Sequence, residues 1–241
     1  MSGQIQDQID AMFARLELEQ IAVFKRKQMA RYTELLLEGL KKSRLTGEKT
    51  AEGIIWRQIY DALYFLKLKE PEPGASIIDL GSGGGLPGIP IKICRPDTAV
   101  HLMDSSRKKA AFLNEATEKL GLQGAYVLWG RAEEYGQNPR YREKCDLVVS
   151  KAVAEMAVLA ELALPFLKIG GRAILYKGPR GNQEAETAEK AIAVCGGQLT
   201  AVWNYELRSG EERALYEITK KNYSPLKYPR RPGKPARNPI K

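Results

Sequence analysis

Four glycines within five residues form the part of this sequence best suited to hold a small ligand. They are Gly81, Gly83, Gly84 and Gly85. Glycine adopts positive φ without strain and lets a ligand lie directly against the main chain. The glycines follow a short apolar run, residues 77–80, which contains the acid Asp79 and is typical of a buried strand. Pro87 or Pro90 then suits the first turn of a helix, where a missing N–H costs little. The stretch predicts a strand, a glycine turn and a helix start around a nucleotide-sized crevice.

Two spacings of these glycines predict different ligands. The dinucleotide pattern G-x-G-x-x-G fits Gly83, Gly85 and Gly88, with Asp104 about twenty residues further on for a ribose. Read from the strand end, the glycines have the spacing of the S-adenosylmethionine-dependent class I methyltransferases, which this stretch resembles. Asp79 favours the second interpretation, because its carboxylate would repel a pyrophosphate but suits a ligand that carries an ammonium and a sulfonium. A plain strand-to-helix turn in another α/β protein is the third interpretation.

Acids also follow the next two strand-like runs. Asp104 ends the second run, and Glu133 comes shortly after the third. A carboxylate in the first place can accept hydrogen bonds from both hydroxyls of a ribose. A carboxylate after the third run, such as that of Glu133, can hold the exocyclic amine of an adenine. Either acid alone could instead cap a helix, as Ser105 and Ser106 can. Acids at three consecutive strand ends, all on the crevice side, predict a ligand site.

Lysines follow two later strand-like runs. Lys151 comes after residues 145–149, and Lys177 opens the basic, glycine-rich loop 177–181 that follows residues 172–176. We expect this loop to lie over the same crevice, since the carboxyl ends of parallel strands share one edge of the sheet.

The amino-acid composition of the chain argues against several classes of protein. Among 241 residues there is one histidine, His101, which lies in a strand-like run and argues against a Ser–His triad. The three cysteines lie far apart, without the close spacing of a zinc site, so we expect no metal. No run of 18 apolar residues occurs and residues 1–10 are polar, so we expect neither a membrane span nor a signal peptide. A reduced, cytoplasmic setting fits this cysteine usage.

Helical and strand-like patterns alternate along the chain. Residues 4–45 and 51–68 carry apolar side chains at helical spacing. Five strand-like runs then alternate with helices, and residues 198–206 and 214–219 read as a closing hairpin. We predict a doubly wound, Rossmann-like α/β sheet of the class I methyltransferase type, with an N-terminal helical extension and an antiparallel C-terminal hairpin. The hairpin argues against a dehydrogenase built of two similar halves.

Positive charge is concentrated at the end of the chain. Residues 220–241 contain eight Lys and Arg and no acid, which leaves residues 1–219 at about +1 of the total +9. A basic tail on a nearly neutral body predicts a polyanionic partner, with nucleic acid ahead of membrane. The alternatives are a disordered, solubilising tail and a tail that is ordered by packing on the protein. The five prolines of the tail are expected to preclude helix and central strand. The chain thus divides into a helical extension (1–70), a methyltransferase domain (71–219) and the tail (220–241).

Basic residues of the extension and the tail are candidates for contact with RNA, and Tyr223 or Tyr228 could stack on a base. The charges on the helices could equally form a solvated face. The candidates are Lys25, Arg26, Arg44, Lys227, Tyr228, Arg230, Arg231, Lys234 and Arg237.

Taken together, the sequence closely resembles the ribosomal RNA small subunit methyltransferase G family, also called glucose-inhibited division protein B. The resemblance covers nearly the whole chain, and the Tyr-Pro-Arg-Arg motif of the tail is more specific than a glycine loop. Weaker matches are Leu45-Thr46 and residues 61–63. The matching stretches are residues 79–90, Asp104-Ser105, residues 130–134, residues 150–154, Lys177-Gly178 and residues 228–235.

The resemblance implies methyl transfer from S-adenosylmethionine to one guanine of the small-subunit (16S) ribosomal RNA, giving 7-methylguanosine. It implies the small ribosomal subunit or its RNA as partner, with neither membrane nor metal, and we expect a monomer. Lys151 and Lys177 are the candidate catalytic residues, placed to flank the target base. The cofactor site implied is Asp79, Gly81, Gly83, Gly85, Leu86, Asp104, Ser105, Ser106, Ala132, Glu133 and Lys151.

The chain departs from the family pattern at three positions. Lys151 stands where an arginine is usual, Gln58 where a histidine is common, and Arg44 where an asparagine precedes Leu45. Lysine keeps the charge but loses the bidentate fork of arginine. A methyltransferase with a shifted RNA target, or an RNA-binding assembly protein that no longer transfers methyl groups, is therefore the alternative. A nicotinamide-dependent reductase is a third hypothesis, against which Asp79 and the basic tail argue.

Overall fold

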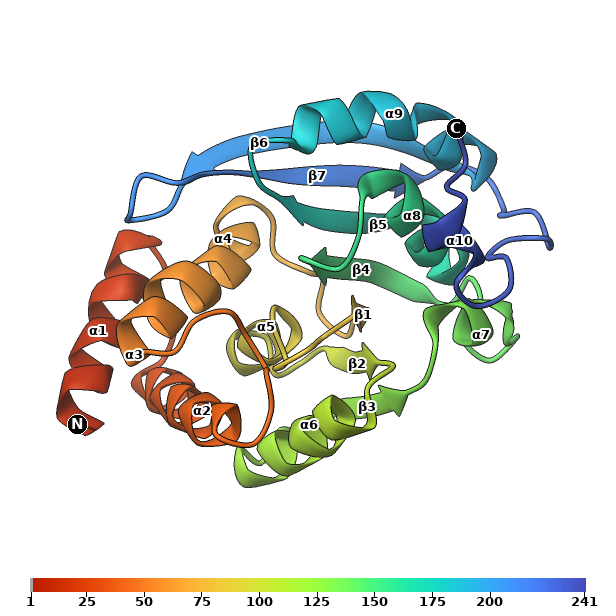
Figure 1. Cartoon of the computed structure of the whole chain (residues 1–241). Coiled ribbons are helices and arrows are strands. Elements are labelled where there is room, and N and C mark those ends of the chain that lie inside the picture. The colour runs from red at the N-terminus through yellow and green to blue at the C-terminus, as the bar shows by residue number, and fades with distance from the viewer. Residues whose placement is uncertain (1) are drawn as a thin grey trace.

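Seven strands form one sheet in the order β3-β2-β1-β4-β5-β7-β6 (Figure 1). The structure is a computed structural model and describes residues 2–241. Strands β1 to β5 are parallel, whereas β7 is antiparallel to both of its neighbours. The predicted hairpin at the end of the sheet is thus confirmed. The strands are β1 (Ser76–Leu80), β2 (Ala99–Asp104), β3 (Ala125–Trp129), β4 (Cys145–Lys151), β5 (Leu167–Lys177), β6 (Gly197–Glu206) and β7 (Glu212–Lys220).

The order of the strands reverses beside β1. The chain runs outward through β2 to β3 and then returns to place β4 on the other side of β1. Ile77 pairs with Leu147 and Asp79 with Val149, so the loops that follow β1 and β4 leave the sheet side by side. Ligands of open α/β sheets bind at such a reversal, outside the carboxyl ends of the strands.

Helices cover both faces of the sheet. Helices α1 to α6 lie on one face, and α8, α9 and α10 on the other (Figure 1). Adjacent strand residues point to opposite faces, so Ile77 belongs to the first hydrophobic cluster and Ile78 to the second. The helices are α1 (Ser2–Arg15), α2 (Val23–Leu40), α3 (Ala51–Gly53), η1 (Ile54–Ile59), α4 (Tyr60–Leu68), α5 (Gly88–Cys94), α6 (Arg107–Lys119), α7 (Ala132–Gln137), α8 (Met156–Ala163), η2 (Leu164–Phe166), α9 (Gly181–Val194) and α10 (Lys234–Arg237).

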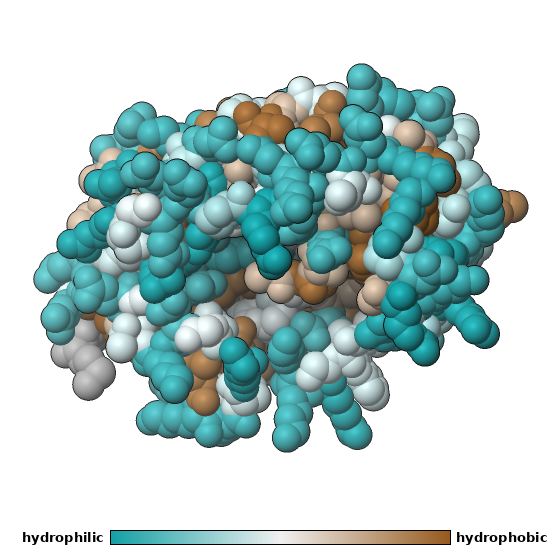
Figure 2. Space-filling model, turned by 45° about the horizontal axis from the view of Figure 1, so that its top comes forward, coloured by the Kyte–Doolittle hydropathy of each residue, from teal (hydrophilic) through white to brown (hydrophobic). Residues whose placement is uncertain are grey.

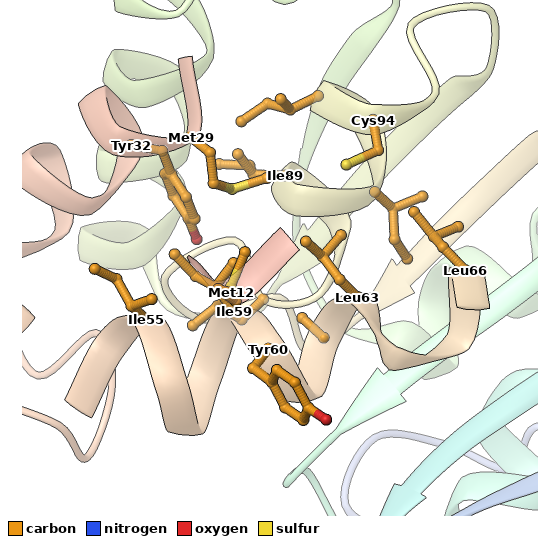
Figure 3. Packing of buried hydrophobic residues seen from close by; sticks show 14 of the residues in the cluster. Met12, Met29, Tyr32, Ile55, Ile59, Tyr60, Leu63, Leu66, Ile89 and Cys94 are labelled. Atoms are coloured by element: carbon orange, nitrogen blue, oxygen red, sulfur yellow. The ribbon is translucent and has the colours of Figure 1, made fainter. Parts of the chain in front are cut away.

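The amino-terminal helices share one hydrophobic cluster with the sheet. Figure 3 shows side chains from α2 (Met29 and Tyr32), from η1 and α4 (Ile59 and Leu63) and from α5 (Ile89) converging on one another. The hydroxyl of the buried Tyr32 donates a 2.8 Å hydrogen bond to the carbonyl of Gly84. The helical extension therefore packs directly beneath the glycine loop.

Of three local expectations, two differ from the structure and the helix 51–68 is confirmed. Residues 4–45 form two helices, because the chain turns after α1 with Glu17 in the left-handed region (φ 58°). The second expected helix, 51–68, is continuous through α3, η1 and α4, with a π-helical turn in the middle. The tail does contain one helical turn, α10, because Pro235 lies in its first turn, where proline's missing N–H is not needed.

The surface in Figure 2 is mainly hydrophilic, with a recess near the middle of the view where apolar and near-neutral residues are exposed. No helix within residues 2–241 is long and apolar enough to cross a membrane. In the same part of the chain, no three histidine, cysteine or acidic side chains form a group that could hold a metal ion.

Candidate active site

The glycine loop after β1 has the backbone conformation that only glycine adopts without strain. Gly81, Gly83 and Gly85 have φ values of 77°, 59° and 96°. Space is also limited, because a Cβ on Gly81 would overlap the side chain of Val153. Any larger residue at position 81 would therefore need both a strained backbone and a shift of Val153.

Asp79 lies beneath this loop and holds it to α5. Its side chain is fully buried, and its Oδ2 accepts a 2.9 Å hydrogen bond from the N–H of Gly88, the first residue of that helix. Its Oδ1 has no hydrogen-bond partner among residues 2–241. Burial raises the pKa of Asp79 to about 7. The carboxylate of Asp79 is thus bound to the backbone at the start of α5.

Asp104, at the end of β2, fixes the loop from the other side. Its Oδ2 accepts a hydrogen bond from Gly83 N–H (2.9 Å), and its Oδ1 accepts one from Ser106 N–H (2.8 Å). Ser106 is the N-cap residue of α6, but its hydroxyl makes no capping hydrogen bond, contrary to the expectation for this side chain. The backbone N–H of Ser106, and not its hydroxyl, makes the hydrogen bond here, and the carboxylate of Asp104 accepts it.

Glu133 lies in α7, a helix of six residues that the sequence analysis did not identify. It is buried, and its Oε1 accepts hydrogen bonds from Arg131 (2.9 Å) and from the backbone N–H of Gly233 in the tail (2.8 Å). Burial alone would raise the pKa of Glu133, but these hydrogen bonds outweigh it and hold the pKa below its usual value. Glu133 is therefore a charged carboxylate at neutral pH.

Asp104 and Glu133 meet in a small cavity of about 90 Å³ at the carboxyl ends of β1, β2 and β3. Of the expected cofactor residues, Gly81, Asp104, Ser105, Ala132 and Glu133 line it. The others lie outside its lining: Asp79, Gly83, Gly85 and Leu86 belong to the loop behind it, Ser106 contacts the back of Asp104, and Lys151 lines a second cavity.

The second cavity, of about 530 Å³, brings Lys151 and Lys177 together as expected from their positions at adjacent strand ends. Lys151 Nζ lies 2.8 Å from Asp61 Oδ2 and donates to the carbonyl of Gln58 (3.0 Å). Lys177 Nζ donates to Glu184 Oε2 (2.7 Å) and to the carbonyl of Ala154 (2.6 Å). Each ammonium is thus held in place by a carboxylate and a carbonyl.

Asp61 is a site residue that the sequence analysis did not identify. Its buried carboxylate pairs with Lys151 and accepts a hydrogen bond from the hydroxyl of Tyr205 in β6. The Tyr205 ring stacks on Tyr64 at a centroid distance of 3.8 Å. The sequence feature that could have identified Asp61 is that it is the only acid in the otherwise apolar stretch from Ile59 to Leu66.

Val153 lines both cavities, and within residues 2–241 no other residue does so. It lies in the loop between β4 and α8, where Ala152 has a left-handed backbone (φ 57°). The helix that follows this loop, α8, begins at Met156. The turn at Ala152 places Val153 against Gly81, so its side chain separates the acidic cavity from the lysine-lined one.

Comparison with known proteins agrees with this arrangement. A model of the family described as rRNA small subunit methyltransferase G (GidB) matches residues 25–215. The chain belongs to the rRNA small subunit methyltransferase G family. It is 44% identical over 226 residues to the enzyme of that name from Moorella thermoacetica, covering 93% of this chain and 92% of the relative. Identity to the Listeria monocytogenes relative is 40% over 215 residues, covering 89% and 90%. The resemblance inferred from the motifs is confirmed.

Solved structures show the same fold at low sequence identity. TrmN from Thermus thermophilus has a TM-score of 0.51 at 22% identity, covering 66% of this chain and 48% of that one. A precorrin-6y C5,15-methyltransferase from Geobacter metallireducens has a TM-score of 0.53 at 13% identity, covering 74% and 92%. The class I methyltransferase fold predicted from the alternating elements is therefore confirmed.

Two tail residues of this methyltransferase that are candidates for RNA contact are engaged within the protein. Tyr228 is only 9% exposed, and the guanidinium of Arg230 is paired with the buried carboxylate of Glu161. Both anchor the tail, Arg230 through Glu161 and Tyr228 through its carbonyl, which accepts a hydrogen bond from Arg142. Tyr223, in contrast, is 71% exposed.

The other candidates for RNA contact fall into two groups. Lys25 donates to the carbonyl of Cys94 (2.9 Å), and Arg26 pairs with Asp10 (3.3 Å), so both hold helices together. The remaining side chains are exposed: Arg44, Lys227, Arg231, Lys234 and Arg237.

Proposed function

We propose that this chain transfers the methyl group of S-adenosylmethionine to N7 of one guanine in small-subunit ribosomal RNA, in the cytoplasm. The main support for this proposal is a pair of adjoining cavities that meet at Val153. One is lined by carboxylates and the other by lysines. A cofactor in the first cavity would direct its methyl group past Val153 into the second.

The smaller cavity has donor groups that fit this cofactor. Each oxygen of Asp104 receives one backbone hydrogen bond, which leaves acceptor capacity for ribose hydroxyls. Both hydrogen bonds to Glu133 end on Oε1, which leaves Oε2 for the adenine amine. When bound, S-adenosylmethionine supplies an electrophilic methyl group. Ligand pockets usually measure at least ~300 Å³, so the cavity of about 90 Å³ must widen when the cofactor binds. Val153 is the side chain that would move.

The larger cavity suits a base carried on a polyanion. Its lining contains five cationic side chains and three acidic ones. Guanine N7 has a free lone pair, so the reaction needs no general base. The protein must instead hold N7 in line with the methyl group, a contribution that can reach ~7–11 kcal/mol. Lys151 and Lys177 would hold the guanine carbonyl oxygen or a flanking phosphate, since a cation does not stabilise the cationic product ring.

The first test is transfer of radiolabel from S-adenosylmethionine to small ribosomal subunits from a strain that lacks the enzyme. Naked small-subunit RNA serves as a parallel substrate. Digestion with nuclease should place the label in 7-methylguanosine at one site. The variant Asp104→Asn should lose transfer, whereas Lys190→Ala, on the exposed side of α9, should retain it. Cofactor binding without transfer to either substrate would replace this proposal with an RNA-binding protein that has lost turnover.

A further inference from the structure

The last residues of the chain lie against the two helices that border the cofactor cavity. We call residues 223–241 the tail segment. Glu133 of α7 and Leu162 of α8 both line that cavity. The backbone N–H of Gly233 donates a 2.8 Å hydrogen bond to Glu133 Oε1, although the two residues are 100 positions apart. The tail segment thus contacts a carboxylate of the cavity directly.

A buried ion pair fixes the tail segment on α8. Glu161 is completely buried, and its two oxygens accept hydrogen bonds from Arg230 Nε (2.8 Å) and Nη2 (2.5 Å). The backbone N–H of Arg230 donates to the same carboxylate (2.8 Å). A bidentate arginine–carboxylate pair is both strong and directional. Glu161 precedes Leu162 in α8, so this pair holds the tail one residue from the cavity wall.

Further bonds join the tail segment to α7 and the turn after it. Gln137 donates to the carbonyl of Pro229 (2.8 Å), and Arg142 donates to the carbonyl of Tyr228 (2.7 Å). The ring of Pro229 packs so closely on Gly136 that a Cβ there would lie 2.8 Å from Pro229 Cγ. The tail segment is held at several points along its length, which places Gly233 reproducibly over Glu133.

We propose that the tail segment is a positioning element of the cofactor site. Arg230 locks it to α8, and Gly233 N–H orients Glu133 so that this carboxylate receives the adenine amine. The inference rests on the proposed function, since it assigns the adenine of S-adenosylmethionine to Glu133. Gly233 itself does not touch the ligand but acts through Glu133.

The test compares Gly233→Ala with Gly210→Ala. Both glycines have left-handed backbones, with φ values of 78° and 80°. Gly210 lies in the turn between β6 and β7, where a Cβ meets nothing within 4 Å. A Cβ on Gly233 would meet only the end of the Arg237 side chain, at 3.0 Å. The two substitutions should therefore lower Tm by similar amounts, whereas only Gly233→Ala should affect ligand binding.

Binding is measured calorimetrically with S-adenosylhomocysteine and with S-inosylhomocysteine, in which a carbonyl replaces the adenine amine. The unmodified protein should prefer the adenine compound by about tenfold or more, as expected for a hydrogen bond to a charged group. Gly233→Ala and Arg230→Met should reduce this preference to about twofold, and Gly210→Ala should leave it unchanged. Loss of general folding would weaken both ligands equally, so the ratio isolates the orientation of Glu133.

Three results would count against the proposals, and they can be told apart. An unchanged preference in Gly233→Ala and Arg230→Met would overturn the inference while leaving the proposed function intact. An equal loss of the preference in Gly210→Ala would also overturn it, because the preference would then not depend on the contact between Gly233 and Glu133. Absence of S-adenosylhomocysteine binding by the unmodified protein would overturn the proposed function, and this inference with it.

Discussion

The ammonium of Lys151 lies 2.8 Å from the carboxylate of Asp61, and both side chains are almost completely buried. Lys151 ends β4, whereas Asp61 belongs to α4 of the amino-terminal extension. The helical extension therefore positions a lysine of the larger cavity. A charge in such a place requires its partner, because removing one member of a buried pair leaves the other desolvated and unpaired.

Asp61→Asn should lower both stability and activity. Loss of one partner of a buried ion pair typically costs about 3–5 kcal/mol, and a freed Lys151 would no longer hold the substrate. Urea unfolding and kcat/KM for methyl transfer measure the two effects. Tyr205→Phe is the matched control, because it removes the hydroxyl bond to Asp61 but keeps the stacking on Tyr64. An Asp61→Asn variant with normal stability and kcat/KM would contradict this role.

Lys151→Ala and Lys177→Ala should each reduce kcat/KM for the RNA substrate about tenfold to hundredfold, because both lysines fix the geometry of the target base. The affinity for S-adenosylhomocysteine should change little, since neither lysine lines the smaller cavity. Lys151→Arg provides the conservative comparison. If both alanine variants kept full kcat/KM, the lysines would have no role in placing the base.

Gly81→Ala should abolish binding of S-adenosylhomocysteine. The new Cβ would require a strained backbone at φ 77° and would overlap Val153 at the junction of the two cavities. Gly74→Ala is a matched control, because Gly74 has φ 75° and a Cβ there meets nothing within 4 Å. Both variants should lose about 1–2 kcal/mol of stability from backbone strain. Equal ligand affinity in the two variants, measured calorimetrically, would disprove a steric role for Gly81.

Asp79→Asn should stabilise the protein at alkaline pH. Burial raises the pKa of Asp79 to about 7 in the folded chain, against 3.8 for an ordinary aspartate side chain. The folded state therefore holds the proton more tightly, so stability falls as pH rises from about 4 to about 7. The free energy of unfolding of Asp79→Asn should match that of the wild type near pH 4. It should exceed it by up to about 4 kcal/mol at pH 8. A difference that does not vary with pH would refute the titration of Asp79.

Replacing the three exposed basic residues Arg231, Lys234 and Arg237 with glutamine should weaken RNA binding and flatten its salt dependence. Each lost phosphate contact on a single strand should reduce the slope of log K against log salt by about 0.7. These side chains are exposed, and the weak hydrogen bond from Arg237 Nε to the carbonyl of Gly233 (3.3 Å) is the bond that the change removes, so the overall fold should be retained. Lys190→Gln, on the exposed side of α9, is the control. An unchanged salt slope, measured by filter binding from low to moderate salt, would show that these three side chains contact no phosphate.

Local patterns in the sequence predicted much of this protein. Three patterns depend only on residues that are close in the sequence. They are the apolar run and glycines of residues 77–85, the alternation of strands and helices, and the acids at strand ends. They were sufficient for the sheet, the crevice and the family. The short helix α7 was missed because six residues carry too little periodicity. The break between α1 and α2 was missed because no proline or glycine marks it.

Only the tertiary structure decided which charges meet. Asp61 and Lys151 are 90 positions apart, and Glu133 and Gly233 are 100 apart, so no spacing along the chain could pair them. The tail shows the consequence most clearly. Its composition predicts an extended, basic segment, but not that Arg230 pairs with a buried carboxylate or that Tyr228 is covered. Burial depends on the surface that packing brings opposite each side chain, which composition does not encode.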